Sequence, residues 1–388
     1  LTSRPYGARL LQSFSGQEWQ TGELAPLSED QRAVVCSLWF RQKAKRDAQQ
    51  LGLNVAHQQE LASTESIKFR DELDRSIELS RLAETPLLLV LLLYMRFQNA
   101  ALPRRRFDAY ERILDHLLRE HPAAKRVAAF VVDSVDSLTD ADVRLALAQL
   151  AFTLQANDNS QVVTEDDLER VVFGFLTDRR GLGLGLEPST ARSMVPAFSR
   201  VVEGSLGIMV RQGVHELSFL HRSFQEFLAS LHMSRLPLLE QEQAIKAYGG
   251  DARWREVFLG LVWRTRRPDE IDRLVSQFQM QVDGTLAGLT MAELLAEIAF
   301  GDFACPPNTA AMLADAVFEN IERHWWMPHR RRLLSQCLEG LQAVRLRERV
   351  RHNLRQWVFA RVRWRPSIYD AMAGWPNTPE VVEFLVSR

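Results

Sequence analysis

The sequence predicts a mainly α-helical protein of several domains. Apolar residues recur at helical spacing along most of the chain, and the candidate helices after residue 245 are separated by prolines. Strand signals are short: the first few residues, and two alternating runs between residues 208 and 220. A length of 388 residues exceeds one ordinary domain, so we expect about two to three domains.

The first elements are the end of a strand and two helices. Residues 1–5 (LTSRP) are typical of a buried parallel strand that leaves a sheet, because Pro5 cannot continue a ladder. Ser28, with Gln31 three residues later, forms a capping-box pattern that opens a helix. A second amphipathic helix is expected over residues 64–83. In the helix that follows Ser28, four apolar residues recur at helical spacing: Val34, Val35, Leu38 and Trp39.

Pro86 opens a strongly apolar helix, at a position where its missing N–H costs nothing. The apolar run from residue 86 to residue 95 is far shorter than the ~20 residues of a membrane-spanning helix. Residues 101–103 break the chain. A further helix is expected over residues 104–120, closed by His121 and Pro122.

Residues 123–235 combine helices with two short strands. Thr164 and Asp167 form a capping pair, and the acidic first turn after Thr164 is explained by the helix dipole. The loop with Gly181 and Gly183 lacks the Gly-Lys-[Ser/Thr] ending of a P-loop, so we interpret it as a flexible connector. Helices followed by a hairpin and another helix make a winged-helix-like unit. We expect helices over 139–155, 164–178 and 190–203, and strands over 208–210 and 215–220.

The remaining third of the chain is expected to be entirely helical. Helix pairs punctuated by proline are typical of an α-solenoid of HEAT type, in which neighbouring repeats complete one another's core. Tryptophans in these helices are expected to fill the cores between repeats, while arginine stems extend outward. The expected helices are 251–265, 268–280, 290–300, 308–325, 329–343, 346–361 and 378–387.

The composition of the chain argues against several classes of function. A net charge of −1 provides no bulk attraction to nucleic acid or acidic lipid. The cysteines, Cys36, Cys305 and Cys337, are widely spaced without a CxxC pattern, so neither a disulfide framework nor a zinc site is expected and a cytoplasmic location is the default. No carboxylate is accompanied by a histidine or serine in a pattern that indicates hydrolytic catalysis, so we assign no catalytic and no metal-ligating residue.

Three segments, taken in order, carry a resemblance to a known family. Residues 1–5 (LTSRP), 84–89 (ETPLLL) and 217–229 (LSFLHRSFQEFLA) resemble the C-terminal part of a bacterial NACHT-type STAND NTPase. This class includes animal inflammasome sensors and bacterial anti-phage proteins. The resemblance implies four parts: residues 1–22 as the C-terminal remnant of the α/β NTPase sheet, 23–103 as a helical bundle domain, 104–235 as a winged-helix domain and 236–388 as a HEAT-like sensor domain.

The same resemblance implies three residues that contact ADP or ATP. Arg4 corresponds to the arginine that senses the γ-phosphate, Pro86 to the proline that packs against adenine, and His221 to the winged-helix histidine that contacts the β-phosphate of ADP. The chemistry fits these roles, since arginine donates two parallel hydrogen bonds to phosphate and a helix start favours anions. The residues alone leave simpler readings open: a solvated arginine, a proline that starts a buried helix, and a capping or core histidine.

The resemblance implies a regulatory switch. ADP would hold the domains closed, and a ligand or protein bound by the repeats would open them, allow exchange for ATP and permit homo-oligomerisation. In bacteria such proteins commonly act in defence against phage. No P-loop motif occurs in the 388 residues, so we expect the chain alone not to hydrolyse ATP. Leu1 is expected to be a cut inside a larger ATPase, whose own upstream NTPase domain would supply Mg²⁺.

Two other function classes stay open. The first is a HEAT-type protein-interaction scaffold without a nucleotide role. The second is a winged-helix or solenoid protein that binds nucleic acid, because arginines alternate with Trp364 and follow Trp325 and Trp326. Nucleic-acid binding would weaken steeply as salt rises. The near-zero net charge and a helix after residue 221 with few basic side chains count against this alternative.

Overall fold

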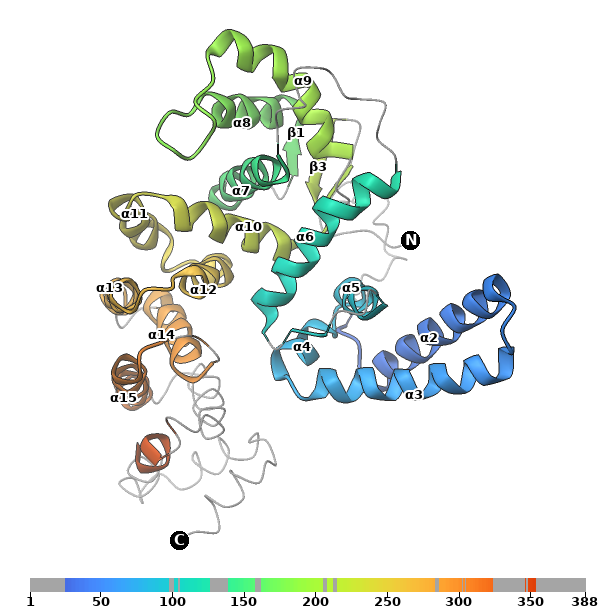
Figure 1. The fold of residues 1–388 in the computed structure, drawn as a ribbon. Helices are drawn as coiled ribbons and strands as arrows, with labels where there is room; N and C mark the ends of the chain where they lie inside the picture. The colour runs from blue at the N-terminus through green and yellow to red at the C-terminus, as the bar shows by residue number, and fades with distance from the viewer. Residues whose placement is uncertain are drawn as a thin grey trace, which may run out of the picture. The chain divides into compact units, whose positions relative to one another are not determined.

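The computed structural model is mainly helical, with one small three-stranded sheet among the residues it describes (Figure 1). These residues are 25–97, 101–103, 105–125, 139–157, 162–204, 208–211, 215–282, 286–301, 303, 305–323, 346 and 348–353. The chain divides into two compact units, one comprising residues 1–129 and 205–217 and the other residues 130–204 and 218–388. Arg4, the expected strand before Pro5 and the helices expected at 329–343 and 378–387 lie outside the described residues.

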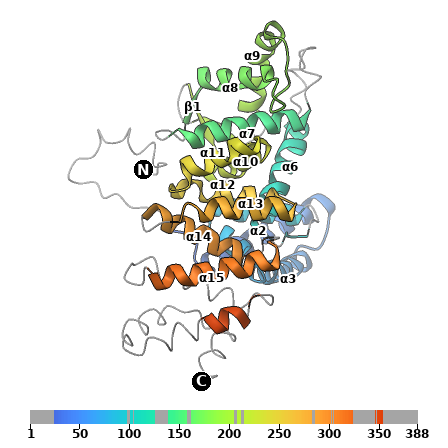
Figure 2. The same cartoon turned by 90° about the vertical axis from the view of Figure 1, so that its left-hand side faces the viewer.

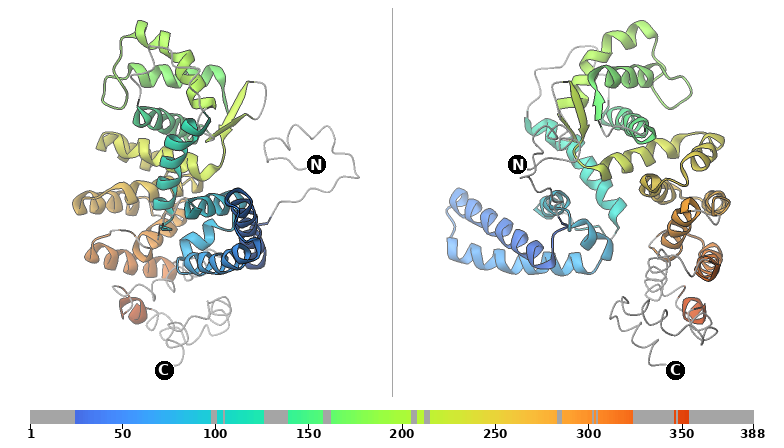
Figure 3. Two further views of the ribbon diagram at one scale, coloured as in Figure 1. Left: turned by 45° about the vertical axis from the view of Figure 1, so that its right-hand side comes forward. Right: turned by 180° about the vertical axis from the view of Figure 1, so that it is seen from behind.

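The first unit begins with a helical hairpin. Helices α2 (Glu29–Leu51) and α3 (Val55–Asp74) pack side by side (Figure 3). The predicted capping box is confirmed: the Ser28 N–H donates to Gln31 Oε1 at 2.9 Å, and the Gln31 N–H donates to Ser28 Oγ at 3.2 Å. Gly52 ends α2 with a left-handed φ of 65°, a conformation that glycine adopts without a steric cost.

Two sequence expectations for this hairpin were wrong. Val34 and Leu38 are exposed, at 56% and 52%, because α2 packs through residues four apart along its other side. The helix expected at 64–83 starts instead at Val55, where the Asn54 side chain accepts the N–H groups of residues 56 and 57, and it is interrupted before α4 (Ile77–Leu82). The buried residues of α2 are Cys36, Phe40, Ala44 and Ala48.

Helices α5 (Pro86–Phe97) and α6 (Arg106–Lys125) complete the described helices of this unit. Pro86 is the first residue of α5, as predicted, and the helix buries Leu88, Leu89, Leu92 and Leu93 almost completely. The expected end of α6 at His121 and Pro122 was wrong, since the helix continues to Lys125. A proline within a helix removes a single backbone donor, so it can bend a helix without ending it.

The second unit starts with α7 (Asp140–Ala156), β1 (Val162–Thr164), α8 (Glu165–Thr177) and α9 (Pro188–Gly204). Strand β2 (Met209–Arg211) and the start of β3 (Glu216–Phe219) fall within residues 205–217, which belong to the first unit. Helix α10 (Arg222–Arg235) of the second unit follows β3 after two residues. The strand order in the sheet is β1-β3-β2. The predicted cap of α8 is confirmed, with the Asp167 N–H donating to Thr164 Oγ1 at 3.1 Å.

The glycine-rich connection between α8 and α9 is a closely packed turn. The N–H of Leu184 donates to the Phe175 carbonyl at 3.0 Å, and that of Leu182 donates to Asp178 Oδ2 at 3.1 Å. A Cβ on Gly183 would lie 1.9 Å from the Phe175 carbonyl oxygen. The interpretation as a connector rather than a phosphate cradle is therefore supported, because these loop N–H groups already have acceptors.

The C-terminal described helices stack in successive layers (Figure 2). Polar contacts connect helices two apart in sequence: Arg264 of α12 to Ser230 of α10 at 3.2 Å, and Arg255 of α12 to Glu297 of α14. Trp254 is fully buried against Phe152, Tyr248 and Phe258, as predicted, whereas Trp263 is half-buried and Trp357 lies outside the described residues. The helices are α11 (Leu238–Tyr248), η2 (Ala252–Trp254), α12 (Arg255–Arg264), α13 (Pro268–Gln279), α14 (Leu286–Phe300) and α15 (Pro307–Arg323).

Among the described residues, no helix is both long enough and apolar enough to cross a membrane. Cys36 and Cys305 are free thiols in the protein interior. Burial raises the pKa of the Cys36 thiol to about 11, with Arg70 and Arg32 opposing this effect, so the thiol is protonated at neutral pH.

Candidate functional site

His221 lies at the junction between β3 and α10, as the sequence predicts, and it is the N-cap of that helix. Its backbone is extended (φ −146°, ψ 143°), and its Nδ1 accepts the N–H of Ser223 at 3.1 Å. A nitrogen that accepts a hydrogen bond carries no proton, so the neutral ring has its hydrogen on Nε2. The capping reading of His221 is therefore correct, and the cap fixes the orientation of the half-buried imidazole.

The start of α10 is electropositive. The helix dipole places partial positive charge at this end, and Arg222 adds a guanidinium whose side chain is 43% exposed. The Nε of Arg222 donates to Glu226 Oε1 at 2.8 Å, one turn further along the helix. His221 and Arg222 thus place an oriented imidazole and a guanidinium that is paired with Glu226 at a helix N-terminus, where the backbone N–H groups favour an anion.

The face of α10 behind this junction is buried. The side chains of Phe219, at the end of β3, and of Phe224, Phe227 and Leu228 are all 4% exposed or less. The polar residues Gln225 and Glu226 are also buried, at only 5% and 8% exposed. Gln225 is held by a hydrogen bond to α7, and Glu226 by Arg222, so both polar groups have a partner.

Pro86 presents its ring at the surface. The residue is exposed, whereas Leu88 and Leu89 immediately after it are 2% and 0% exposed. Its role as the start of a buried helix is confirmed, and an exposed, donor-free ring also provides a flat apolar face. Pro86 and His221 belong to different compact units, and Arg4 lies outside the described residues.

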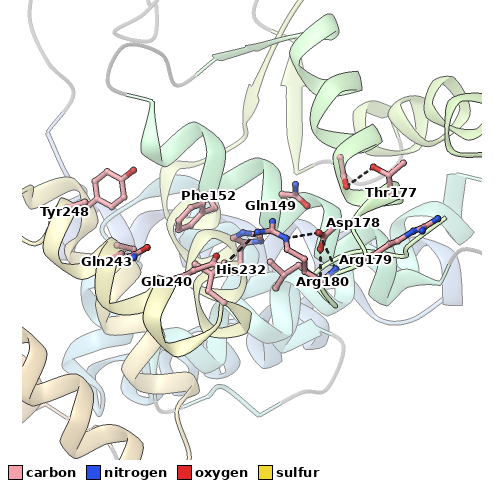
Figure 4. A pocket seen from close by; sticks show the side chains of 15 residues that line it. Gln149, Phe152, Thr177, Asp178, Arg179, Arg180, His232, Glu240, Gln243 and Tyr248 are labelled. Atoms are coloured by element: carbon pink, nitrogen blue, oxygen red, sulfur yellow. Dashed lines mark hydrogen bonds and ion pairs between the residues drawn. The ribbon is translucent and has the colours of Figure 1, made fainter. Parts of the chain in front are cut away.

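A cavity that sequence reasoning missed lies within the second unit. It has a volume of about 990 Å³ and is lined by residues of α7, α8, the glycine-rich connection, α10 and α11 (Figure 4). Its walls carry two exposed arginines at the rim, aromatic rings from Phe152 and Tyr248, and the imidazole of His232. No motif in the sequence indicates it, because single residues from separate helices build it.

The charged groups of this cavity are paired with one another. Arg180 Nε lies 3.0 Å from Asp178 Oδ1, and its Nη1 lies 3.9 Å from Glu240. Partial burial opposes ionisation of Asp178, but hydrogen bonds from Arg180 and from the N–H groups of Arg180 and Leu182 hold its pKa below the ordinary value. Asp178 is therefore ionised at neutral pH and holds Arg180 across the cavity (Figure 4).

His232 forms part of the cavity wall as a neutral imidazole. Its ring contacts Phe152, with centroids 4.9 Å apart and planes inclined by 42°. Burial, together with the positive charges of Arg235 and Arg180, lowers the pKa of His232 from 6.5 to about 4, with Asp178 opposing. At neutral pH the ring therefore offers one hydrogen-bond donor and one acceptor.

Known proteins give no further indication of function. No family model matches the chain, and neither the search of curated proteins nor that of solved structures found a match. Within the described part of the chain, no group of three or more histidine, cysteine, aspartate or glutamate side chains could hold a metal ion. Function must therefore be inferred from the chemistry of the His221 junction, Pro86 and the cavity.

Proposed function

We propose that the chain is the regulatory and sensor portion of a nucleotide-gated signalling NTPase. In this proposal ADP holds the inactive state, and Arg4, Pro86 and His221 contact the nucleotide. Exchange for ATP allows homo-oligomerisation in the cytoplasm, in a response of the anti-phage kind. The missing NTPase domain provides the phosphate cradle and Mg²⁺, so this part of the protein binds and regulates rather than catalyses hydrolysis.

The position of His221 carries the proposal. Its Nδ1 accepts the Ser223 N–H, which fixes the orientation of the ring at the first turn of α10. The backbone N–H groups and the dipole at this end of α10 favour negative charge. A histidine whose orientation is fixed by its own helix cap, at a helix end that favours anions, supports a role in contacting phosphate.

The order of elements supports the winged-helix assignment for residues 104–235. Helix α7, strand β1, helices α8 and α9, and strands β2 and β3 follow one another in the sequence of a winged-helix unit, and the strand order β1-β3-β2 fits it. Helix α10 follows β3 after two residues and packs on α7. The position of His221 between β3 and α10 supports the role that the resemblance implies for it.

Pro86 and the stacked helices support the other parts of the proposal. An adenine ring needs an accessible apolar surface, and the exposed ring of Pro86 provides one at the start of a firmly packed helix. The helices after residue 238 stack in layers with polar contacts between helices two apart, an arrangement suited to HEAT-like repeats that present an extended binding surface.

Replacing His221 by asparagine tests the proposal. Asparagine is a good N-cap, so the variant His221→Asn retains a capping oxygen while removing the imidazole. The full-length protein, expressed from its whole coding sequence, would be purified, denatured and analysed for released nucleotide by chromatography. We expect the parent protein to release ADP, and both His221→Asn and Arg4→Ala to release much less.

A matched substitution controls for nonspecific effects. His57→Asn replaces an exposed histidine in the first turn of α3 and should leave ADP retention unchanged. If His221→Asn and Arg4→Ala retain as much ADP as the parent protein, the imidazole is a helix cap only. The scaffold alternative would then be preferred.

One observation favours the scaffold alternative. A groove of about 460 Å³ between α2 and α3 is lined by the exposed apolar side chains of Val34, Leu38 and Ile67. Arg41 and Arg70 line the same groove. Apolar residues rimmed by cations are typical of a protein-binding surface, so the first unit has a feature that a protein-interaction module would use.

A further inference from the structure

We propose that the cavity between α7, α8, α10 and α11 binds a planar, uncharged heteroaromatic ligand of about nucleoside size, recognised by the imidazole of His232 and the side-chain amide of Gln149. This site is separate from the His221 junction, and the proposal does not depend on nucleotide gating. It assigns a function to a cavity that lies entirely within the second unit.

The size of the cavity suits a small molecule. Its volume of about 990 Å³ lies at the upper end of the range of roughly 300–1,000 Å³ that is typical of ligand pockets. Leu182, Leu236 and Ala244 supply apolar wall from three different segments. A ligand that enters it would contact this apolar surface on one side while its other side faces the open mouth of the cavity.

Aromatic rings in the wall favour a planar ligand. Phe152 and His232 contact each other, and each has a ring in the cavity lining (Figure 4). Tyr248 lines the other end while it stacks on the buried Trp254, with centroids 4.0 Å apart and planes 5° from parallel. Since Trp254 fixes Tyr248, the aromatic surface is formed before a ligand binds, and flat rings stack on such surfaces.

Two polar groups in the wall have hydrogen-bonding capacity to spare. His232 is neutral at pH 7, and Gln149 carries an amide with both donors and an acceptor. Neither side chain forms a hydrogen bond with any other residue that the structure describes. The edge of a heteroaromatic ring presents donors and acceptors next to one another in the ring plane. Such a ligand can hydrogen-bond to both the imidazole and the amide, whereas a purely hydrocarbon ligand cannot.

The charges of the wall argue against an anionic ligand. Arg180 is held by Asp178 and lies near Glu240, and Arg179 lies 2.5 Å from Glu187. A phosphate or carboxylate would compete with these carboxylates for the guanidinium groups. An uncharged ligand leaves the existing pairs intact, so this cavity is distinguished chemically from a nucleotide site.

Binding would be measured by NMR on the chain labelled at its nine histidines. Adenosine, guanosine, cytidine and uridine are the probes, with AMP as the charged comparison and indole as the ring without a matching polar edge. The His232 signal is assigned by its absence from the spectrum of His232→Phe. We expect at least one nucleoside to shift the His232 signal saturably, with AMP and indole binding more weakly.

Two substitutions test the recognition residues. His232→Phe keeps an aromatic ring but removes both nitrogens, and should weaken nucleoside binding roughly tenfold, as for a lost hydrogen bond in a dry site. Gly174→Ala adds a methyl group 3.7 Å from Gln149 Nε2 and should weaken binding without unfolding the chain, because alanine is the better helix former. His57→Phe, on an exposed part of α3, should bind like the parent chain.

Any of three results would overturn the proposal. The first is that none of the four nucleosides at millimolar concentration shifts the His232 signal saturably. The others are that His232→Phe binds a nucleoside as tightly as the parent chain, or that AMP binds more tightly than adenosine. Binding by His232→Phe is measured by titration calorimetry, so the loss of the reporter does not hide the outcome. Because these readouts are at His232 and in the isolated chain, they fail or succeed independently of ADP retention by the full-length protein.

Discussion

Gln225 and Gln155 form a buried amide pair between α10 and α7, in which Gln225 Nε2 donates to Gln155 Oε1 at 2.9 Å. Gln155 Nε2 in turn donates to the backbone carbonyl of Arg253 at 2.7 Å, so one chain of hydrogen bonds joins α7, α10 and η2. Both glutamines are at most 5% exposed. The buried amide pair favours one register of α10 against α7, because a shift of either helix would leave the amides without partners.

Removing one member of this pair should destabilise the fold. In Gln225→Leu the Gln155 oxygen loses its donor in a buried place, and we expect a loss of about 1–3 kcal/mol in unfolding free energy. The double variant Gln155→Leu with Gln225→Leu should lose less unfolding free energy than the sum of the single changes, since the two residues hydrogen-bond to each other. Urea denaturation measures both, with the exposed Gln59→Leu as the control. An unchanged midpoint for Gln225→Leu would contradict the pair's importance.

The stability of the second unit should depend on pH through His232. Its folded-state pKa of about 4 lies below the unfolded value of 6.5, so the unfolded chain binds a proton first as pH falls. Stability is unaffected above pH 6.5, is lost between about pH 6.5 and 4, and falls no further from this group below pH 4. Arg235, Arg180 and Asp178 are the charged groups that act on the ring.

The expected loss over that window is about 1–3 kcal/mol once solvent screening is allowed for. Urea midpoints measured from pH 8 to pH 4 check it, and His232→Phe should flatten the profile between pH 6.5 and 4. Carboxylates with lowered pKa values, such as Asp178 and Asp251, lose their contribution at lower pH and should still be visible in the variant. An identical slope in His232→Phe would show that His232 is not the titrating group.

Local chemistry was the most predictable part of this structure. The caps by Ser28 and Thr164 and the proline start of α5 follow from residues within four positions of one another, and all were confirmed. The position of His221 between strand and helix was predictable for the same reason. Such features need no knowledge of what packs against them.

Features that depend on packing were not predictable. The burial of Gln225 follows from its partner Gln155, which is 70 residues away in sequence. The buried stripe of α2 consists of Phe40, Cys36 and two alanines, whereas the apolar residues Val34 and Leu38 face outward, so the apolar pattern of the sequence did not identify the buried side. His232 stood out in no pattern, because the cavity exists only once separate helices have packed together.

The glycine-rich connection provides a steric prediction. A Cβ at residue 183 would lie 1.9 Å from the Phe175 carbonyl oxygen, far inside contact distance, and neither group is at the end of a flexible side chain. Gly183→Ala must therefore move the end of α8, at a cost of about 3 kcal/mol. Gly174→Ala, whose Cβ has room, serves as the control. Thermal unfolding at one pH compares them, and equal melting temperatures would contradict the close approach.

The cap by His221 separates two roles that the ring can play. His221→Ala removes the acceptor of the Ser223 N–H, and should lower stability by about 1 kcal/mol as for other lost N-caps. His221→Asn restores an acceptor and should recover most of that loss, which urea denaturation of the chain can measure. If both variants are equally destabilised, the imidazole stabilises the junction through more than its cap. If only His221→Ala is destabilised, any loss of ADP retention in His221→Asn reflects the absent Nε2–H, because the helix start itself is intact.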